Sequence, residues 1–173
     1  DDNPALNNKW FLNLCKSIQE LPEEIEIIFS NFSIKSINSE IIEALKNIRQ
    51  EKISIAIETG SQEIQKTIKK HLNLENIIEK VKLIRKNGLK VHACWMIGFP
   101  NETLDQIKQT TRMAVDIQTD SIQVWPVFPF PGTEMYRVSK EQNLINMDEN
   151  DFDTMKQHTP GKILSSEWDG ELL

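Results

Sequence analysis

Cysteine is scarce in this chain, and long apolar runs are missing. Cys15 and Cys94 are the only cysteines among 173 residues, and two thiols so far apart do not form a disulfide framework. We therefore expect a reducing, cytoplasmic location. No apolar run reaches the length that a membrane-spanning helix needs, and no charged-then-apolar leader is visible. The sequence thus predicts no membrane partner.

An excess of basic residues is also lacking. Lys and Arg number 20 against 26 Asp and Glu, which leaves a formal net charge of −6. The basic residues are spread along helical patterns, whereas a phosphate-binding surface needs a concentrated basic patch. We therefore expect no nucleic-acid surface on this segment. The length is sufficient for one domain with a real core.

What the chain does contain is a regular alternation of strand and helix patterns. Four β-branched segments alternate with segments whose apolar residues recur at helical spacing, and this order predicts an α/β fold of parallel βα units. The predicted strands are Ile25–Ser30, Ile53–Glu58, Lys90–Ile97 and Ser121–Phe128. The predicted helices are Asn7–Glu20, Ser39–Gln50, Ser61–Lys70, Leu74–Asn87, Thr103–Gln118 and Thr133–Asn143.

The second predicted strand alternates strictly between two kinds of side chain. Isoleucines stand at 53, 55 and 57, and small or polar residues stand at 54, 56 and 58. A barrel that is filled by its own side chains prefers bulky branched residues inside. With the isoleucines against outer helices, the inner face is small and polar, which predicts an interior that holds a ligand.

A turn that contains glycine ends this strand, with the sequence Glu58-Thr59-Gly60-Ser61. Gly60 permits a tight turn and a close approach of a ligand. The carboxylate of Glu58 and the two hydroxyls suit an amino group, a carboxylate or ribose hydroxyls. The residues leave an alternative open, in which Ser61 is only a helix N-cap and Glu58 a solvated charge.

A second turn ends the strand at 90–97, with the sequence Gly98-Phe99-Pro100-Asn101-Glu102. Gly98 lets the backbone lie close to a ligand. Asn101 tolerates left-handed backbone angles, and Glu102 is expected to support the loop or the helix start. A plain turn between strand and helix is the alternative. The next four residues, 103–106, fit a capping box.

A proline-rich segment, Trp125-Pro126-Val127-Phe128-Pro129-Phe130-Pro131-Gly132-Thr133, follows the last predicted strand. Prolines make a loop with few hydrogen bonds rigid. The alternative is a structural turn with core aromatics. All three turns follow the carboxyl ends of strands, where parallel α/β barrels bind their ligands.

Taken in this order, the three turns resemble those of the radical S-adenosylmethionine (SAM) enzymes. The family patterns are E-S-G-S, I-G-x-P-G-E-T and P-x-P-G-T, and this chain has Thr59 and Asn101 in place of a serine and a glycine. The resemblance implies a partial TIM-like barrel of about four parallel strands with outer helices, which is the C-terminal part of a six-stranded barrel over 1–143, followed by an extension over 144–173. The implied SAM-binding residues are Glu58, Thr59, Gly60, Ser61, Gly98, Phe130 and Gly132.

The resemblance extends to the amino terminus. Asp1-Asp2 is similar to the carboxylate-bearing end of the family's second strand, where such a group can bind the amino group of the methionine moiety, so Asp2 is added to the implied set. At the terminus of this chain we expect the pair to be frayed. The strand that precedes it is expected upstream of Asp1.

The resemblance also implies chemistry that this chain does not complete. Family members hold a [4Fe–4S] cluster on three cysteines spaced CxxxCxxC, cleave SAM reductively to methionine and a 5′-deoxyadenosyl radical, and act on a small-molecule substrate; a large subgroup also carries cobalamin. The cluster cysteines are absent here, so no metal ligand is assigned. We expect an iron–sulfur enzyme as the parent and no catalysis from this chain alone. Cys94 is expected to be a buried core residue.

Two other functions remain open at this stage. One is a non-catalytic half-barrel that binds a nucleotide-like ligand or a partner. The other is a different βα enzyme, such as a phosphate-binding barrel, which needs a Gly-rich phosphate loop or a catalytic Lys near a strand end; we find neither. The strand predicted at 25–30 would also be an exposed sheet edge, and its apolar residues predict self-association with a second copy.

Overall fold

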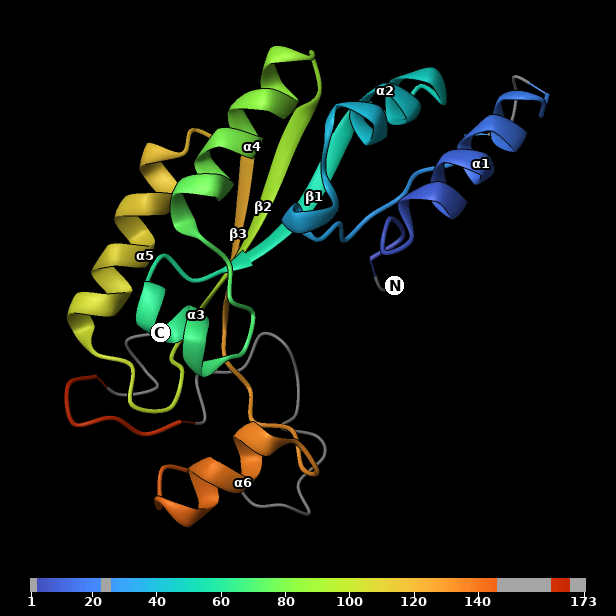
Figure 1. Ribbon diagram of the computed structural model, residues 1–173. Coiled ribbons are helices and arrows are strands. Elements are labelled where there is room, and N and C mark those ends of the chain that lie inside the picture. Colours follow the sequence, from blue (N-terminus) through green and yellow to red (C-terminus); the bar gives the residue numbers. More distant parts are fainter. Residues whose placement is uncertain (1–2, 23–25, 146–162, 169–173) are drawn as a thin grey trace. The chain divides into compact units, whose positions relative to one another are not determined.

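The computed structural model describes residues 3–22, 26–145 and 163–168 of the chain (Figure 1). The chain divides into two compact units. The first consists of residues 1–57, 71–94 and 114–123, and the second consists of residues 58–70, 95–113 and 124–173. The carboxyl ends of the strands and the turns that follow them belong to the second unit.

Three parallel strands form the sheet of the described residues, in the order β1-β2-β3. They are β1 (Lys52–Glu58), β2 (Lys90–Ile97) and β3 (Ser121–Pro126), drawn as arrows in Figure 1. The helices are α1 (Asn8–Gln19), α2 (Ser39–Asn47), α3 (Gln62–Thr67), α4 (Leu74–Lys86), α5 (Leu104–Asp116) and α6 (Glu134–Glu141), with a 3₁₀ turn at Ile34–Ser36. Helices connect successive strands, as parallel pairing requires. The α/β alternation predicted from the sequence is confirmed.

The prediction of a strand at 25–30 is wrong. Residues 26–30 carry no strand, and Ile25 lies outside the described residues. The side-chain amide of Gln50 donates to the Phe29 carbonyl at 2.7 Å and accepts from its N–H at 2.9 Å. These bonds occupy main-chain groups that a neighbouring strand would otherwise use. Asn31 then has φ +59, which interrupts the extended run, and among the described residues of this segment Phe32 alone bridges in parallel to Ile55.

The predicted alternation along the strands is confirmed. Ile53, Ile55 and Ile57 of β1 are fully buried, and the residues between them are partly exposed. Strand β2 shows the same pattern, because its residues 91, 93 and 95 are fully buried and those at 92, 94 and 96 are partly exposed. Cys94 therefore lies on the partly exposed face, and the expectation of a core cysteine is wrong for it. Cys15 is fully buried.

Short polar side chains begin most of the helices, as the sequence indicates. The N-cap side chains that accept a backbone N–H are Asn7, Asn38, Ser61, Asn73 and Thr133. At α5 the predicted capping box is present, since the Gln106 N–H donates to the Thr103 hydroxyl at 3.2 Å and the Thr103 N–H donates to the Gln106 side chain at 2.9 Å. These bonds satisfy N–H groups that a helix start leaves unpaired.

Among the helices of the described ranges, none has the length and apolar character that crossing a membrane requires.

Candidate active site

Glu58, the last residue of β1, has a left-handed backbone with φ +73. Such an angle is unfavourable for a residue with a Cβ atom and is a form of strain often stored at functional sites. The carboxylate accepts a hydrogen bond from Lys70 Nζ at 2.5 Å. About a fifth of the Glu58 side chain remains exposed (19%), so a ligand can still reach it. Sequence patterns did not single out Lys70, which follows α3 and is not a member of any of the three motifs.

The two hydroxyls of this first turn are used inside the protein. Thr59 is fully buried and its hydroxyl lies 3.0 Å from the Thr110 hydroxyl and accepts the Ser61 N–H at 3.1 Å. The Ser61 hydroxyl accepts the Ile64 N–H at 3.4 Å, as the N-cap of α3. The N-cap alternative that the sequence left open for Ser61 is therefore present in the structure.

Gly60 is in contact with helix α5. A Cβ atom at this position would lie 2.8 Å from both the Gln109 carbonyl oxygen and the Thr110 Cα, which is closer than real Cβ atoms approach. The Gly60 N–H also donates to the Thr110 hydroxyl at 3.0 Å. The glycine is thus required here by the packing of the turn on α5.

The second turn is built around the side chain of Glu102. One carboxylate oxygen, Oε2, accepts the N–H groups of Gly98 at 2.6 Å and of Phe99 at 3.1 Å. Gly98 has φ +86 and Asn101 has φ +61, so both adopt the left-handed region that their residue types tolerate. The Glu102 N–H closes the turn on the Phe99 carbonyl at 2.9 Å. The expectation that Glu102 supports the loop is confirmed.

Glu102 is buried, with a residue exposure of 1%. Burial raises the pKa of its carboxyl group above the ordinary value, and the hydrogen bonds from Phe99 and Gly98 partly oppose this rise. Its second oxygen, Oε1, has no hydrogen-bond partner in the described residues. Glu102 therefore organises the turn and is too enclosed to contact a cofactor directly.

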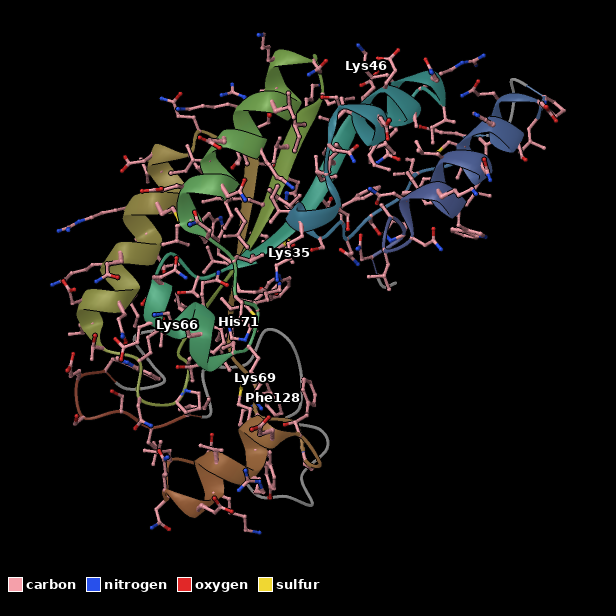
Figure 2. The ribbon with its side chains drawn as sticks, viewed as in Figure 1. Lys35, Lys46, Lys66, Lys69, His71 and Phe128 are labelled. Carbon is pink, nitrogen blue, oxygen red and sulfur yellow. The ribbon has the colours of Figure 1, made fainter. Side chains whose placement is uncertain are left out.

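The third turn presents an aromatic ring and an open glycine. Phe130 is half-exposed at 48%, and its ring lies 4.6 Å from that of Phe128, which Figure 2 labels on the segment between β3 and α6. The Thr133 hydroxyl and N–H both donate to the Phe130 carbonyl, at 2.7 and 3.1 Å. Gly132 has φ +87, and among the described residues, its chain neighbours aside, no atom lies within 4 Å of a Cβ built there. A planar ligand can therefore approach this turn.

One buried cluster connects the three turns. Its members are Ile64, Phe99, Val127, Ile163 and Trp168, each no more than 3% exposed. Ile64 lies three residues after the first turn, Phe99 is in the second and Val127 is in the third. The relative position of the turns is thus determined by apolar packing within one compact unit.

The predicted SAM-binding residues include one that the structure does not describe. Asp2 lies outside the described residues. No group of three or more His, Cys, Asp or Glu side chains in the described ranges can hold a metal ion. A cavity of about 400 Å³ opens beside the second turn, between α3 and α6, and its mainly apolar lining includes Ile68 and Met135. It contains none of the predicted SAM-binding residues.

Parallel strands that alternate with helices, with the three turns after their carboxyl ends, are the arrangement of an α/β barrel. A sequence model of the Radical SAM superfamily matches residues 2–114. The chain therefore belongs to the radical SAM superfamily, as its three turns indicated.

The chain resembles known proteins in sequence and, for a solved structure, in fold. An uncharacterized methyltransferase of Pyrococcus horikoshii is 27% identical over 100% of this chain and 38% of its own length. A tRNA-2-methylthio-N(6)-dimethylallyladenosine synthase of Buchnera aphidicola is 30% identical over 82% of this chain and 33% of its own length. The solved radical SAM methyltransferase of Kitasatospora setae superposes with a TM-score of 0.69 at 14% identity, over 84% of this chain and 30% of that one.

The coverages show how much of a relative's length the chain matches. It spans about a third of the length of the curated relatives that it matches. Its three parallel strands are thus a part of the TIM-like barrel of the family, and the sequence prediction of a partial barrel is confirmed, with three strands in the described residues in place of about four.

Proposed function

We propose that this chain is the C-terminal part of the barrel of a radical SAM iron–sulfur enzyme, and that its three turns bind SAM. One observation carries the proposal. The turns that follow β1, β2 and β3 are joined by a single buried cluster, yet Glu58, Phe130 and Gly132 keep surface that a ligand can reach. Residues 1–143 are assigned to the barrel and 144–173 to an extension.

The proposed roles differ between residues that face a ligand and residues that shape the turns. Glu58 is proposed to accept hydrogen bonds from an amino group or from ribose hydroxyls. Phe130 and Gly132 are proposed to flank the adenine. The backbone at Gly98 is proposed to lie beside the adenosyl group. Asp2 remains a proposed ligand of the methionine amino group, on the strength of its resemblance alone.

Thr59, Gly60 and Ser61 are proposed to act on SAM through the conformation of the first turn. Their hydroxyls and N–H groups are engaged with Thr110 and with the start of α3. What they contribute to binding is the direction in which Glu58 points. This differs from the direct hydroxyl contacts that the sequence favoured, and the difference rests on the burial of Thr59 and Ser61.

The chemistry of the whole protein follows from its family. When bound, SAM and a [4Fe–4S] cluster supply a radical that removes a hydrogen atom from a small-molecule substrate. The cluster ligands are proposed to come from outside this chain, since it has two cysteines and the family holds its cluster on three. Cobalamin is a proposed second cofactor of the parent, and the cytoplasm its proposed location. Pairing with a second copy through residues 25–30 is not proposed, because residues 26–30 form no strand.

A non-catalytic binding scaffold is the competing function, and one experiment separates the two. The full-length protein is purified without oxygen, its iron is counted, and SAM binding is measured by calorimetry for the wild type, Glu58→Gln and Glu43→Gln. Glu43 is exposed on α2 in the first unit and serves as the control.

We expect about four irons per protein in the wild type and SAM binding that Glu58→Gln weakens by about tenfold, which corresponds to one lost charge-assisted hydrogen bond. Glu43→Gln should bind as the wild type does. A protein that takes up no iron and binds no SAM would be the scaffold. Equal SAM affinity in wild type and Glu58→Gln would remove Glu58 from the site.

A further inference from the structure

The described C-terminal segment, residues 163–168, packs directly on the second turn. Trp168 is buried, with an exposure of 3%, and its indole Nε1–H donates to the Glu102 carbonyl at 2.8 Å. The preceding residue, Glu167, accepts the Leu104 N–H at 2.8 Å through Oε2. Two neighbouring side chains of the segment thus bind the main chain on both sides of Thr103, where the turn becomes helix α5.

The same segment contributes to the cluster that joins the three turns. Ile163 and Trp168 supply two of its five buried members, and the others come from α3, the second turn and the third turn. Without those two side chains, Ile64, Phe99 and Val127 would lose part of their shared packing. The segment therefore takes part in the packing that joins the three turns.

The segment is itself held in place at its start. The Leu164 N–H donates to the Leu144 carbonyl at 2.7 Å, and Ile163 forms an antiparallel bridge with Ile145. These contacts attach it to the chain that follows α6. A main-chain attachment at one end and an indole anchor at the other limit the movement of the segment.

We propose that Trp168 and Glu167 are positioning residues for SAM, and that they act by holding the backbone of the second turn in its binding conformation. This inference rests on the proposed function, because the ligand is the one proposed above. Neither side chain contacts the ligand in this proposal. Trp168 fixes the main-chain carbonyl of Glu102. The carboxylate of Glu102 in turn accepts the N–H groups of Gly98 and Phe99.

The test uses two measurements on the full-length protein purified without oxygen. The first is the hydrogen-exchange rate of the Gly98 and Phe99 amides without SAM, and the second is SAM affinity by calorimetry. The variants are Trp168→Phe, which keeps a ring and removes the N–H donor, Glu167→Ala, and Trp10→Phe as the control. Trp10 is a surface tryptophan with an exposure of 57%.

Trp168→Phe and Glu167→Ala should each raise the exchange rate of the two amides and weaken SAM binding by about threefold to tenfold, which is the value of one hydrogen bond. The melting temperature of Glu167→Ala should stay near that of the wild type, because the side chain is exposed. A loss of affinity at unchanged global stability separates positioning from a merely structural role. Trp10→Phe should change neither quantity.

Three other outcomes would refute either this inference or the proposed function. Unchanged exchange and unchanged affinity in both variants would overturn the inference. Faster exchange with unchanged affinity would show that the segment holds the turn without positioning SAM, which also overturns it. A wild type that binds no SAM, combined with faster exchange in the variants, would refute the proposed function and leave the structural link between Trp168 and the second turn intact.

Discussion

Lys70 Nζ lies 2.5 Å from Glu58 Oε1, and this ion pair joins the residue that ends β1 to the segment that follows α3. Both side chains are partly buried, with exposures of 34% and 19%. The pair holds the carboxylate at the carboxyl end of the strand while the backbone of Glu58 has φ +73. A charged residue is thus kept at a strained position that a glycine would adopt without cost.

The strain at Glu58 predicts an unusual order of stabilities. Glu58→Gly and Glu58→Ala both lose the ion pair, but only glycine relieves the left-handed backbone. We expect Glu58→Gly to be about 1 kcal/mol more stable than Glu58→Ala, as measured by urea unfolding. Both variants should bind SAM more weakly than the wild type. Equal stabilities of the two variants would mean that the backbone at this position carries no strain.

Packing on α5 predicts a large effect at Gly60. An added methyl would meet backbone atoms at 2.8 Å, and backbone cannot move aside as a flexible side chain can. We expect Gly60→Ala to lower the free energy of unfolding by about 2–3 kcal/mol. Gly88→Ala is the matched control, since its Cβ would meet no atom of the described residues within 4 Å, its chain neighbours aside, and its φ of +84 is the unfavourable feature. It should cost about 1 kcal/mol.

Removing the side chain of Glu102 should loosen the second turn. Glu102→Ala leaves the buried N–H groups of Gly98 and Phe99 without an acceptor, which we expect to cost about 2–4 kcal/mol of unfolding free energy. Glu102→Gln keeps an oxygen acceptor and removes the buried charge. It should therefore stay within about 1 kcal/mol of the wild type at neutral pH.

The raised pKa of Glu102 predicts a pH dependence with a definite sign. Because burial raises the pKa of the folded state, the native protein binds this proton more tightly than the unfolded chain does. Its contribution to stability is thus fully present below the unfolded pKa and is lost as the pH rises through the folded pKa. The stability of the wild type relative to Glu102→Gln should fall as the pH rises above about 4.5. If the difference in stability between the wild type and Glu102→Gln did not change with pH, this would contradict the raised pKa of Glu102.

The two cysteines should differ in reactivity. Cys15 is fully buried and burial raises the pKa of its thiol, which lowers its thiolate fraction at neutral pH. Cys94 is partly exposed on β2. Brief treatment of this 173-residue chain with iodoacetamide should therefore label Cys94 first, as read by peptide mass spectrometry. Unfolding in urea should make both react. Equal labelling of the folded chain would contradict the burial of Cys15.

Local chemistry explains why much of the fold was predictable. Asn38, Asn73 and Thr133 are caps because their short polar side chains satisfy N–H groups within three residues. Strand β2 begins and ends at the predicted residues, Lys90 and Ile97. Asn101 adopts the left-handed angle expected where the family has glycine. The caps and the angle at Asn101 depend on neighbours that are close in the sequence, whereas β2 also pairs with strands that are distant in the chain.

Long-range partners explain what was missed. The 25–30 segment has a strand-like composition, but the Gln50 side chain takes the main-chain bonds of Phe29. Lys70 pairs with Glu58 twelve residues away, and the role of Trp168 depends on a carbonyl 66 residues earlier. No periodicity or motif records such pairings, so they emerge only when the chain is folded.

The sequence by itself determined the family, the α/β alternation, the helix starts and the three turns that we propose as the SAM site. The family follows from the resemblance of the three turns to known motifs, and the other features follow from side-chain periodicity and from residue types with special backbone or capping properties. The tertiary structure decided which polar groups stay available. It directs the Thr59 and Ser61 hydroxyls into the protein and leaves Glu58 and Phe130 accessible. The physical reason is that a buried polar group must find a partner, and which partner is within reach depends on packing between elements that are distant in the chain.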